Sequence, residues 1–182
     1  MTQVDVLERR VLFEGRVFRL RQDRIRLPNG RETTMDIVEH RGAVLILPID
    51  EKGNIWFTRQ YRYAVNQTLL ELPAGTLEPE ENPLVCAQRE LREEIGFMAL
   101  EWAYLGSLYP APGYTTEKIV AYLAQQLKPA PLEHDSDEII EPVALPWPQV
   151  WHMVREGEIQ DGKTLAALFL AFPYLQTLEA KP

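Results

Sequence analysis

The first third of the chain alternates between hydrophobic and polar positions with a period of two, which is typical of β-strands. Apolar residues alternate with arginines over residues 18–27, and a Pro-Asn-Gly turn follows at residues 28–30. A second alternating stretch runs over residues 33–39. The pattern predicts a β-hairpin over residues 16–39.

The middle and the end of the chain predict further strands and two helices. Residues 43–49 (AVLILPI) form a continuous apolar run, as in a buried strand. A glycine-containing turn then leads to residues 55–60, which are expected to be its antiparallel partner. Beyond residue 99 the periodicity predicts strands at residues 100–108 and 119–125, and helices at residues 146–155 and 164–174.

One further helix is predicted between Asn82 and Gly96. Asparagine is a strong N-cap, the proline that follows it suits the first helical position, and glycine suits the end of a helix. Apolar residues recur inside it at the spacing of a core-facing stripe. They are Leu84, Ala87, Leu91 and Ile95.

The same helix carries Glu90, Glu93 and Glu94 within little more than one turn. At about 100° per residue, Glu90 and Glu93 clear the apolar stripe and Glu94 lies at its edge. Each like-charged pair at this spacing costs a few tenths of a kcal/mol on a solvated helix. Two interpretations follow: an acidic face screened by water and salt, or a site for hard dications such as Mg²⁺ or Mn²⁺.

Length, charge and cysteine content narrow the class of protein. At 182 residues the chain is expected to form one domain, and its strands and helices do not alternate regularly. A mixed sheet with helices packed on it therefore fits better than a doubly wound fold. The net charge of -8 disfavours a nucleic-acid partner. The single cysteine, the lack of a signal-type leader and the lack of a membrane-length apolar run predict a soluble cytoplasmic protein.

The segment from Gly75 to Phe97 resembles the Nudix box. That motif is a glycine, five residues, Glu, seven residues, then Arg-Glu-aliphatic-any-Glu-Glu-any-Gly-hydrophobic. Its seven fixed positions give a chance match on the order of one in a billion per start position. Phe97 is a soft departure, since an aliphatic residue is usual there. The matching residues are Gly75, Glu81, Arg89, Glu90, Leu91, Glu93, Glu94, Gly96 and Phe97.

The resemblance implies an α/β/α sandwich with a mixed sheet, and hydrolysis of a nucleoside diphosphate linked to another moiety. It implies that Glu90, Glu93 and Glu94 bind catalytic Mg²⁺, for which Mn²⁺ is a possible substitute. The backbone carbonyl of Ala74 is implied as a further metal ligand. Structural roles within the box are implied for Gly75, Glu81, Arg89 and Gly96.

Residues 109–117 (YPAPGYTTE) resemble a downstream motif of ADP-ribose pyrophosphatases, through Pro112, Gly113 and Glu117. The alternative is a Pro/Gly turn between strands. The stretches TRQYRYAV and EHRGAV are similar to segments of the same enzymes in which arginines lie at the substrate. This similarity implies substrate contacts for Arg62 and Arg41, although arginines near strand ends are also common surface ion-pair partners.

Two further expectations come from the same resemblance. An acidic stretch over residues 132–141 is the expected source of the general base, with Glu138 as the choice; a solvated surface loop is the alternative. Residues 1–40 are expected to be an N-terminal antiparallel β region that pairs two subunits into a homodimer. Residues 41–182 would then be the Nudix core.

The expected activity is Mg²⁺-dependent hydrolysis of ADP-ribose to AMP and ribose 5-phosphate. A box glutamate is the alternative general base to Glu138. Two other functions stay open: hydrolysis of another dinucleotide or nucleotide sugar (FAD, NADH or GDP-mannose), and a non-catalytic Nudix sensor that binds ADP-ribose. The sensor is disfavoured because all three glutamates are present and 182 residues leave no room for an added DNA-binding module.

Overall fold

A computed structural model describes residues 4–133 and 139–179 of the chain. The chain forms two compact units. Unit 1 is made of Met1–Gly42 and Tyr109–Lys118, and unit 2 of Ala43–Leu108 and Ile119–Pro182. The boundary at residue 42 is close to the predicted boundary at residue 40, whereas the single-domain interpretation stays a prediction.

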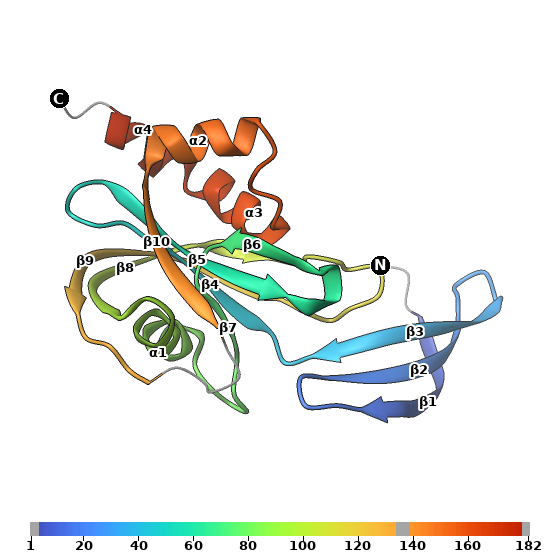
Figure 1. The fold of residues 1–182 in the computed structure, drawn as a ribbon. Helices are drawn as coiled ribbons and strands as arrows, with labels where there is room; N and C mark the ends of the chain where they lie inside the picture. Colours follow the sequence, from blue (N-terminus) through green and yellow to red (C-terminus); the bar gives the residue numbers. More distant parts are fainter. Residues whose placement is uncertain (1–3, 134–138, 180–182) are drawn as a thin grey trace. The chain divides into compact units, whose positions relative to one another are not determined.

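Unit 1 is built on a three-stranded antiparallel sheet in the order β1-β2-β3 (Figure 1). The predicted hairpin is confirmed: β2 (Phe18–Arg26) and β3 (Glu32–His40) pair antiparallel. In the turn between them, the Gly30 amide donates to the Leu27 carbonyl at 2.9 Å, and Gly30 has φ 79°, which glycine adopts without strain. β1 (Asp5–Glu14) adds a third strand on the other side of β2.

Unit 2 contains a mixed sheet in the order β7-β4-β9-β8 and an antiparallel sheet in the order β10-β5-β6. β4 lies parallel to β9 and antiparallel to β7. The expected pairing of residues 43–49 with 55–60 is wrong, because β4 and β5 belong to different sheets and meet only at the single bridge between Ile49 and Ile55. The strands are β4 (Ala43–Pro48), β5 (Asn54–Arg62), β6 (Gln67–Glu71), β7 (Ala74–Thr76), β8 (Phe97–Leu108), β9 (Ile119–Pro129) and β10 (Ile140–Pro146).

The alternation of β4 explains the layers of unit 2, since successive side chains on a strand point to opposite faces. Leu45 and Leu47 belong to an apolar cluster with residues of α2 (Trp147–Arg155), α3 (Gly162–Leu170) and α4 (Phe172–Glu179). Val44 and Ile46 pack in a second cluster with α1 (Pro83–Ile95). Figure 1 shows α1 on one side of the strands and α2 and α3 on the other. The predicted α/β/α sandwich with a mixed sheet is confirmed.

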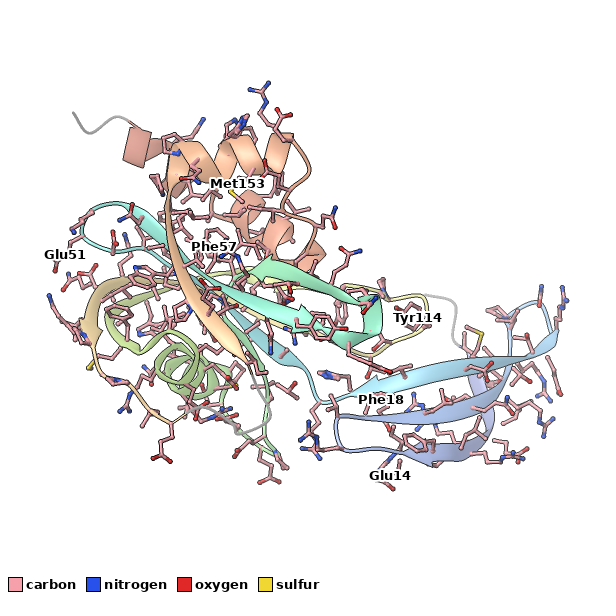
Figure 2. The ribbon with its side chains drawn as sticks, in the orientation of Figure 1. Glu14, Phe18, Glu51, Phe57, Tyr114 and Met153 are labelled. Atoms are coloured by element: carbon pink, nitrogen blue, oxygen red, sulfur yellow. The ribbon has the colours of Figure 1, made fainter. Side chains whose placement is uncertain are left out.

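The C-terminal helices differ from the predicted boundaries. The helix expected at residues 164–174 is two helices, because α3 ends at Leu170 and α4 begins at Phe172. Pro173 has no amide hydrogen and restricts the residue before it, so a continuous helix is disfavoured there. Phe57 on β5 and Met153 on α2 belong to the apolar layer under these helices (Figure 2). Among the described residues, no helix has the length and apolar character needed to span a membrane.

Candidate active site

Helix α1 begins and ends where the sequence predicts. The Asn82 side chain accepts a hydrogen bond from the Leu84 amide at 2.9 Å, and Gly96 ends the helix in the left-handed region with its amide bonded to the Leu91 carbonyl. Cys86, which joins the apolar stripe, is fully buried. Burial raises the pKa of its thiol, and the charge of Glu90 raises it further, so the residue is a packing group and not a nucleophile.

The three glutamates of α1 are less exposed than their spacing suggests. Glu90 is 9% exposed and Glu94 is 4% exposed, although Glu90 clears the apolar stripe. The reason is Gly75 on β7: a Cβ placed there would lie 1.9 Å from the carboxyl carbon of Glu90. The missing side chain of the glycine therefore makes the space in which the Glu90 carboxylate lies. Glu94 is anchored separately, since its Oε2 accepts from the Ala74 amide at 3.1 Å.

Arg89 forms ion pairs both with Glu81, near the start of the Nudix-like segment, and with two glutamates of α1. Its Nε and Nη2 donate to the two Glu81 oxygens at 3.2 Å each, while Nη1 contacts Glu90 at 2.7 Å and Glu93 at 2.8 Å. Burial lowers the pKa of the Arg89 guanidinium, but the bond to Glu81 and the charge of Glu90 outweigh it, so the net shift is upward. A guanidinium with fixed bidentate geometry suits the orienting part expected of Arg89 and Glu81.

The donor chemistry around α1 fits a hard divalent cation. Glu81, Glu90, Glu93 and Glu94 lie together, and Arg89 is the cation that contacts three of them. Carboxylates held away from water carry a large energetic cost unless cations compensate them. In the described ranges, no set of three or more His, Cys, Asp or Glu side chains is arranged to enclose a metal ion. Oxygens of Glu90 and Glu94 bond to Arg89 and to the Ala74 amide. The glutamates therefore supply oxygen ligands of the right kind, but their side chains do not surround a metal position.

Arg62 lies at the end of β5, and its partly exposed side chain forms an ion pair with a buried carboxylate. Its Nε and Nη2 donate to the two oxygens of Glu71 at 2.8 and 2.9 Å. The Glu71 side chain is 2% exposed and also contacts Lys163 at the start of α3. The pKa of Arg62 is raised by the bond to Glu71, against burial, and the charge of Glu94 raises it further. Arg62 is therefore within electrostatic reach of a box glutamate.

Comparison with known proteins agrees with this geometry. A model of the NUDIX domain matches residues 39–168, and a model of the nucleoside diphosphate sugar hydrolase N-terminal domain matches residues 4–34. The chain belongs to the Nudix family. The first match covers most of unit 2, including the whole of the box, and the second covers most of the three-stranded sheet of unit 1.

Individual relatives of this Nudix chain span nearly its whole length. It is 34% identical to an ADP-ribose pyrophosphatase of Bacillus subtilis, over 93% of this chain and 90% of that one. It is 36% identical to a methanol dehydrogenase activator of Bacillus methanolicus over the same shares, and 36% identical to an ADP-ribose pyrophosphatase of Mycobacterium tuberculosis over 98% and 87%. A solved structure of an ADP compounds hydrolase superposes with TM-score 0.84 at 26% identity, covering 96% of this chain and 95% of the other.

The other predicted substrate residues of the Nudix chain belong to unit 1. Pro112 and Gly113 lie in a turn in which the Tyr114 amide donates to the Ala111 carbonyl at 3.2 Å. Glu117 Oε1 lies 4.0 Å from His40 Nδ1.

Arg41 lines a cavity of about 300 Å³ in unit 1. The other charged residues of its lining are Glu14, Arg16, Arg19, Glu39 and His40; Figure 2 labels Glu14 and the neighbouring Phe18.

Unit 2 brings together Ala74, Glu90, Glu94 and Arg62, whereas Glu138 lies outside the described residues. Sequence reasoning missed Glu71 and Lys163. Glu71 could have been found because it follows the apolar residues of the stretch Thr-Leu-Leu-Glu. A charged residue at such a buried position requires a partner. For Lys163 the signal was Asp161, a strong N-cap two residues before it.

Proposed function

We propose that this Nudix protein hydrolyses the pyrophosphate bond of ADP-ribose and gives AMP and ribose 5-phosphate. The observation that carries the proposal is the cluster of three carboxylates on α1, two of them buried, held by Arg89 and the Ala74 amide and within electrostatic reach of Arg62. The names of the relatives support ADP-ribose as the substrate.

The proposed metal is Mg²⁺, with Mn²⁺ as a substitute. Glu90, Glu93 and Glu94, with the carbonyl of Ala74, are the proposed ligands. When bound, a dication neutralises the pyrophosphate and lowers the pKa of a coordinated water. Two residues keep the ligands in place. Gly75 leaves space for the Glu90 carboxylate, and Arg89 binds Glu81 on one side and Glu90 on the other.

The chain's own residues perform the remaining tasks in this proposal. Hydrolysis adds one water across the P–O–P bridge, so the water oxygen bonds to one phosphorus and the bridging oxygen leaves with the other phosphate. Arg62 balances the phosphate charge, and Glu138 or a box glutamate takes the proton of the water. Arg41, Pro112, Gly113 and Glu117 are proposed to contact the rest of the substrate.

We also propose a cytoplasmic homodimer. Unit 1 presents several exposed apolar side chains along its antiparallel sheet, and exposed apolar surface can mark an interaction site. A second copy of the same sheet is the partner proposed to cover them. The side chains are Val6, Val11, Leu12, Phe13, Phe18 and Met35.

A substrate panel tests the proposed activity. Purified protein is incubated with Mg²⁺ and, in turn, ADP-ribose, FAD, NADH and GDP-mannose, and the release of AMP or GMP and of the sugar phosphate is measured. We expect ADP-ribose to have the highest kcat/KM. A higher value for another substrate would favour the other Nudix hydrolases. Binding of ADP-ribose without any hydrolysis would instead favour the sensor.

A further inference from the structure

Glu71 is a buried carboxylate to which the proposed reaction assigns no role. It ends β6, its side chain is 2% exposed, and both of its oxygens bond to the guanidinium of Arg62. Oε2 also contacts Lys163 Nζ, and Lys163 lies 2.9 Å from Asp161 Oδ1. Two cations therefore share one carboxylate that has almost no contact with water.

Bonds other than those of Glu71 also attach α3 to the sheet. The Leu72 amide donates to Thr164 Oγ1 at 2.8 Å, and that hydroxyl donates to Asp161 Oδ2 at 2.6 Å. These bonds already hold the start of α3 against the end of β6. A buried ion pair is in addition a poor source of stability, because desolvation offsets most of the attraction between the charges. A role in stability alone leaves the choice of a carboxylate at position 71 unexplained.

The location of Glu71 connects it to the carboxylates of α1. Only two residues separate it from Ala74, whose amide donates to Glu94 Oε2 at 3.1 Å. The bonds of Arg62 to Glu71 use Nε and Nη2, and among the described residues Nη1 makes no hydrogen bond. Arg62 is thus fixed along one edge of its guanidinium, and Nη1 is left for an acceptor.

We propose that Glu71 is the positioning residue of Arg62. It holds the guanidinium by a bidentate pair so that Nη1 faces the diphosphate of the substrate next to the carboxylates of α1. Lys163 supplies the second cation that compensates Glu71 when Arg62 shares its charge with a phosphate. This inference rests on the proposed function, because it requires a diphosphate substrate.

A double-mutant cycle tests the pairing. KM and kcat are measured for Glu71→Gln, Arg62→Ala and the double variant, with the substrate that the wild type hydrolyses best. We expect each single change to raise KM about tenfold, as for the loss of one charge-assisted contact. We expect the double variant to resemble Arg62→Ala alone, because Glu71 acts through Arg62. Independent effects that multiply to about a hundredfold would overturn the proposal.

A matched control separates positioning from stability. Val150→Ala removes buried apolar volume from α2 and should lower the melting temperature while KM stays unchanged. Glu71→Gln that lowered the melting temperature and left KM unchanged would contradict the proposal. If Glu71→Gln fails to fold, Arg62→Lys is measured instead. Lysine cannot form the bidentate pair, so a wild-type KM in that variant would also contradict it.

The substrate panel distinguishes the two levels of failure. A wild-type protein that hydrolyses no diphosphate-linked nucleotide refutes the proposed function, and this inference with it. A wild-type protein that is active, with independent effects at positions 62 and 71, refutes the inference alone.

Discussion

At the scale of single residues, Gly75 shows how a motif glycine can serve packing instead of a turn. Its backbone does not have a positive φ, and a side chain there would collide with the Glu90 carboxylate. The sequence identifies the glycine through its spacing from Glu90. The requirement for glycine at this position follows only from the tertiary structure, because the packing of β7 against α1 brings position 75 next to the Glu90 side chain.

This contact predicts the effect of Gly75→Ala. The added methyl group displaces the Glu90 carboxylate, so we expect kcat/KM to fall by roughly 10- to 100-fold, as for changes in the residues that support metal ligands. Steady-state kinetics over a Mg²⁺ titration measures it. Gly162→Ala is the control, since nothing lies within 4 Å of a Cβ there. Equal kinetics for Gly75→Ala and the wild type would show that this contact does not position Glu90.

At the scale of elements, local signals predicted α1 and the β2–β3 hairpin but not the partners of β4. The Asn82 cap and the Gly96 stop act within a few residues, so the sequence contains them. The partners of β4 lie elsewhere in the chain: β9 begins more than 70 residues after β4. Hydrophobic patterns relate residues that are close in the sequence, so they favour the adjacent strand β5 as the partner of β4. That prediction was wrong.

The sequence predicts β1 only as part of the β region at residues 1–40, without bounds or a partner, for a related reason. In β1 (Asp5–Glu14), charged residues occupy positions at which a half-buried strand would have apolar side chains. The period-two alternation of apolar and polar residues is therefore weak. Ion pairs across the strands accompany this pattern, as between Glu8 and Arg24 at 3.6 Å and between Arg9 and Asp23 at 3.4 Å. Such pairs become recognisable only once the register of β1 against β2 is known.

The contact between α3 and β6 predicts a loss of stability in Thr164→Val. Valine has nearly the same shape, but it leaves the buried Leu72 amide without its acceptor. We expect the free energy of unfolding to fall by about 1–3 kcal/mol, measured by urea denaturation. Thr68→Val, at an exposed position of β6, should stay within about 0.5 kcal/mol of the wild type. Equal stability of the two variants would exclude this bond as a support of α3.

At the scale of the whole molecule, the apolar surface of unit 1 predicts a dimer that one charge can weaken. Phe13 is 55% exposed and packs against Phe18, with ring centroids 6.2 Å apart. We expect Phe13→Lys to shift the mass measured by light scattering towards the monomer, because a lysine in an apolar interface carries a desolvation cost. Val85→Lys, at a position 54% exposed on α1, is the matched control. A monomeric wild type would refute the dimer.

The carboxylates of α1 are proposed to hold the metal ion, and Glu94→Gln tests this role most directly. Glutamine retains an oxygen that can accept from the Ala74 amide but removes the charge that a dication requires. The measurement is ADP-ribose hydrolysis over a Mg²⁺ titration, with Glu156→Gln, at an exposed position after α2, as the control. We predict a fall in turnover of roughly 100-fold or more with little change in melting temperature. Wild-type turnover in Glu94→Gln would contradict a role of Glu94 as a metal ligand.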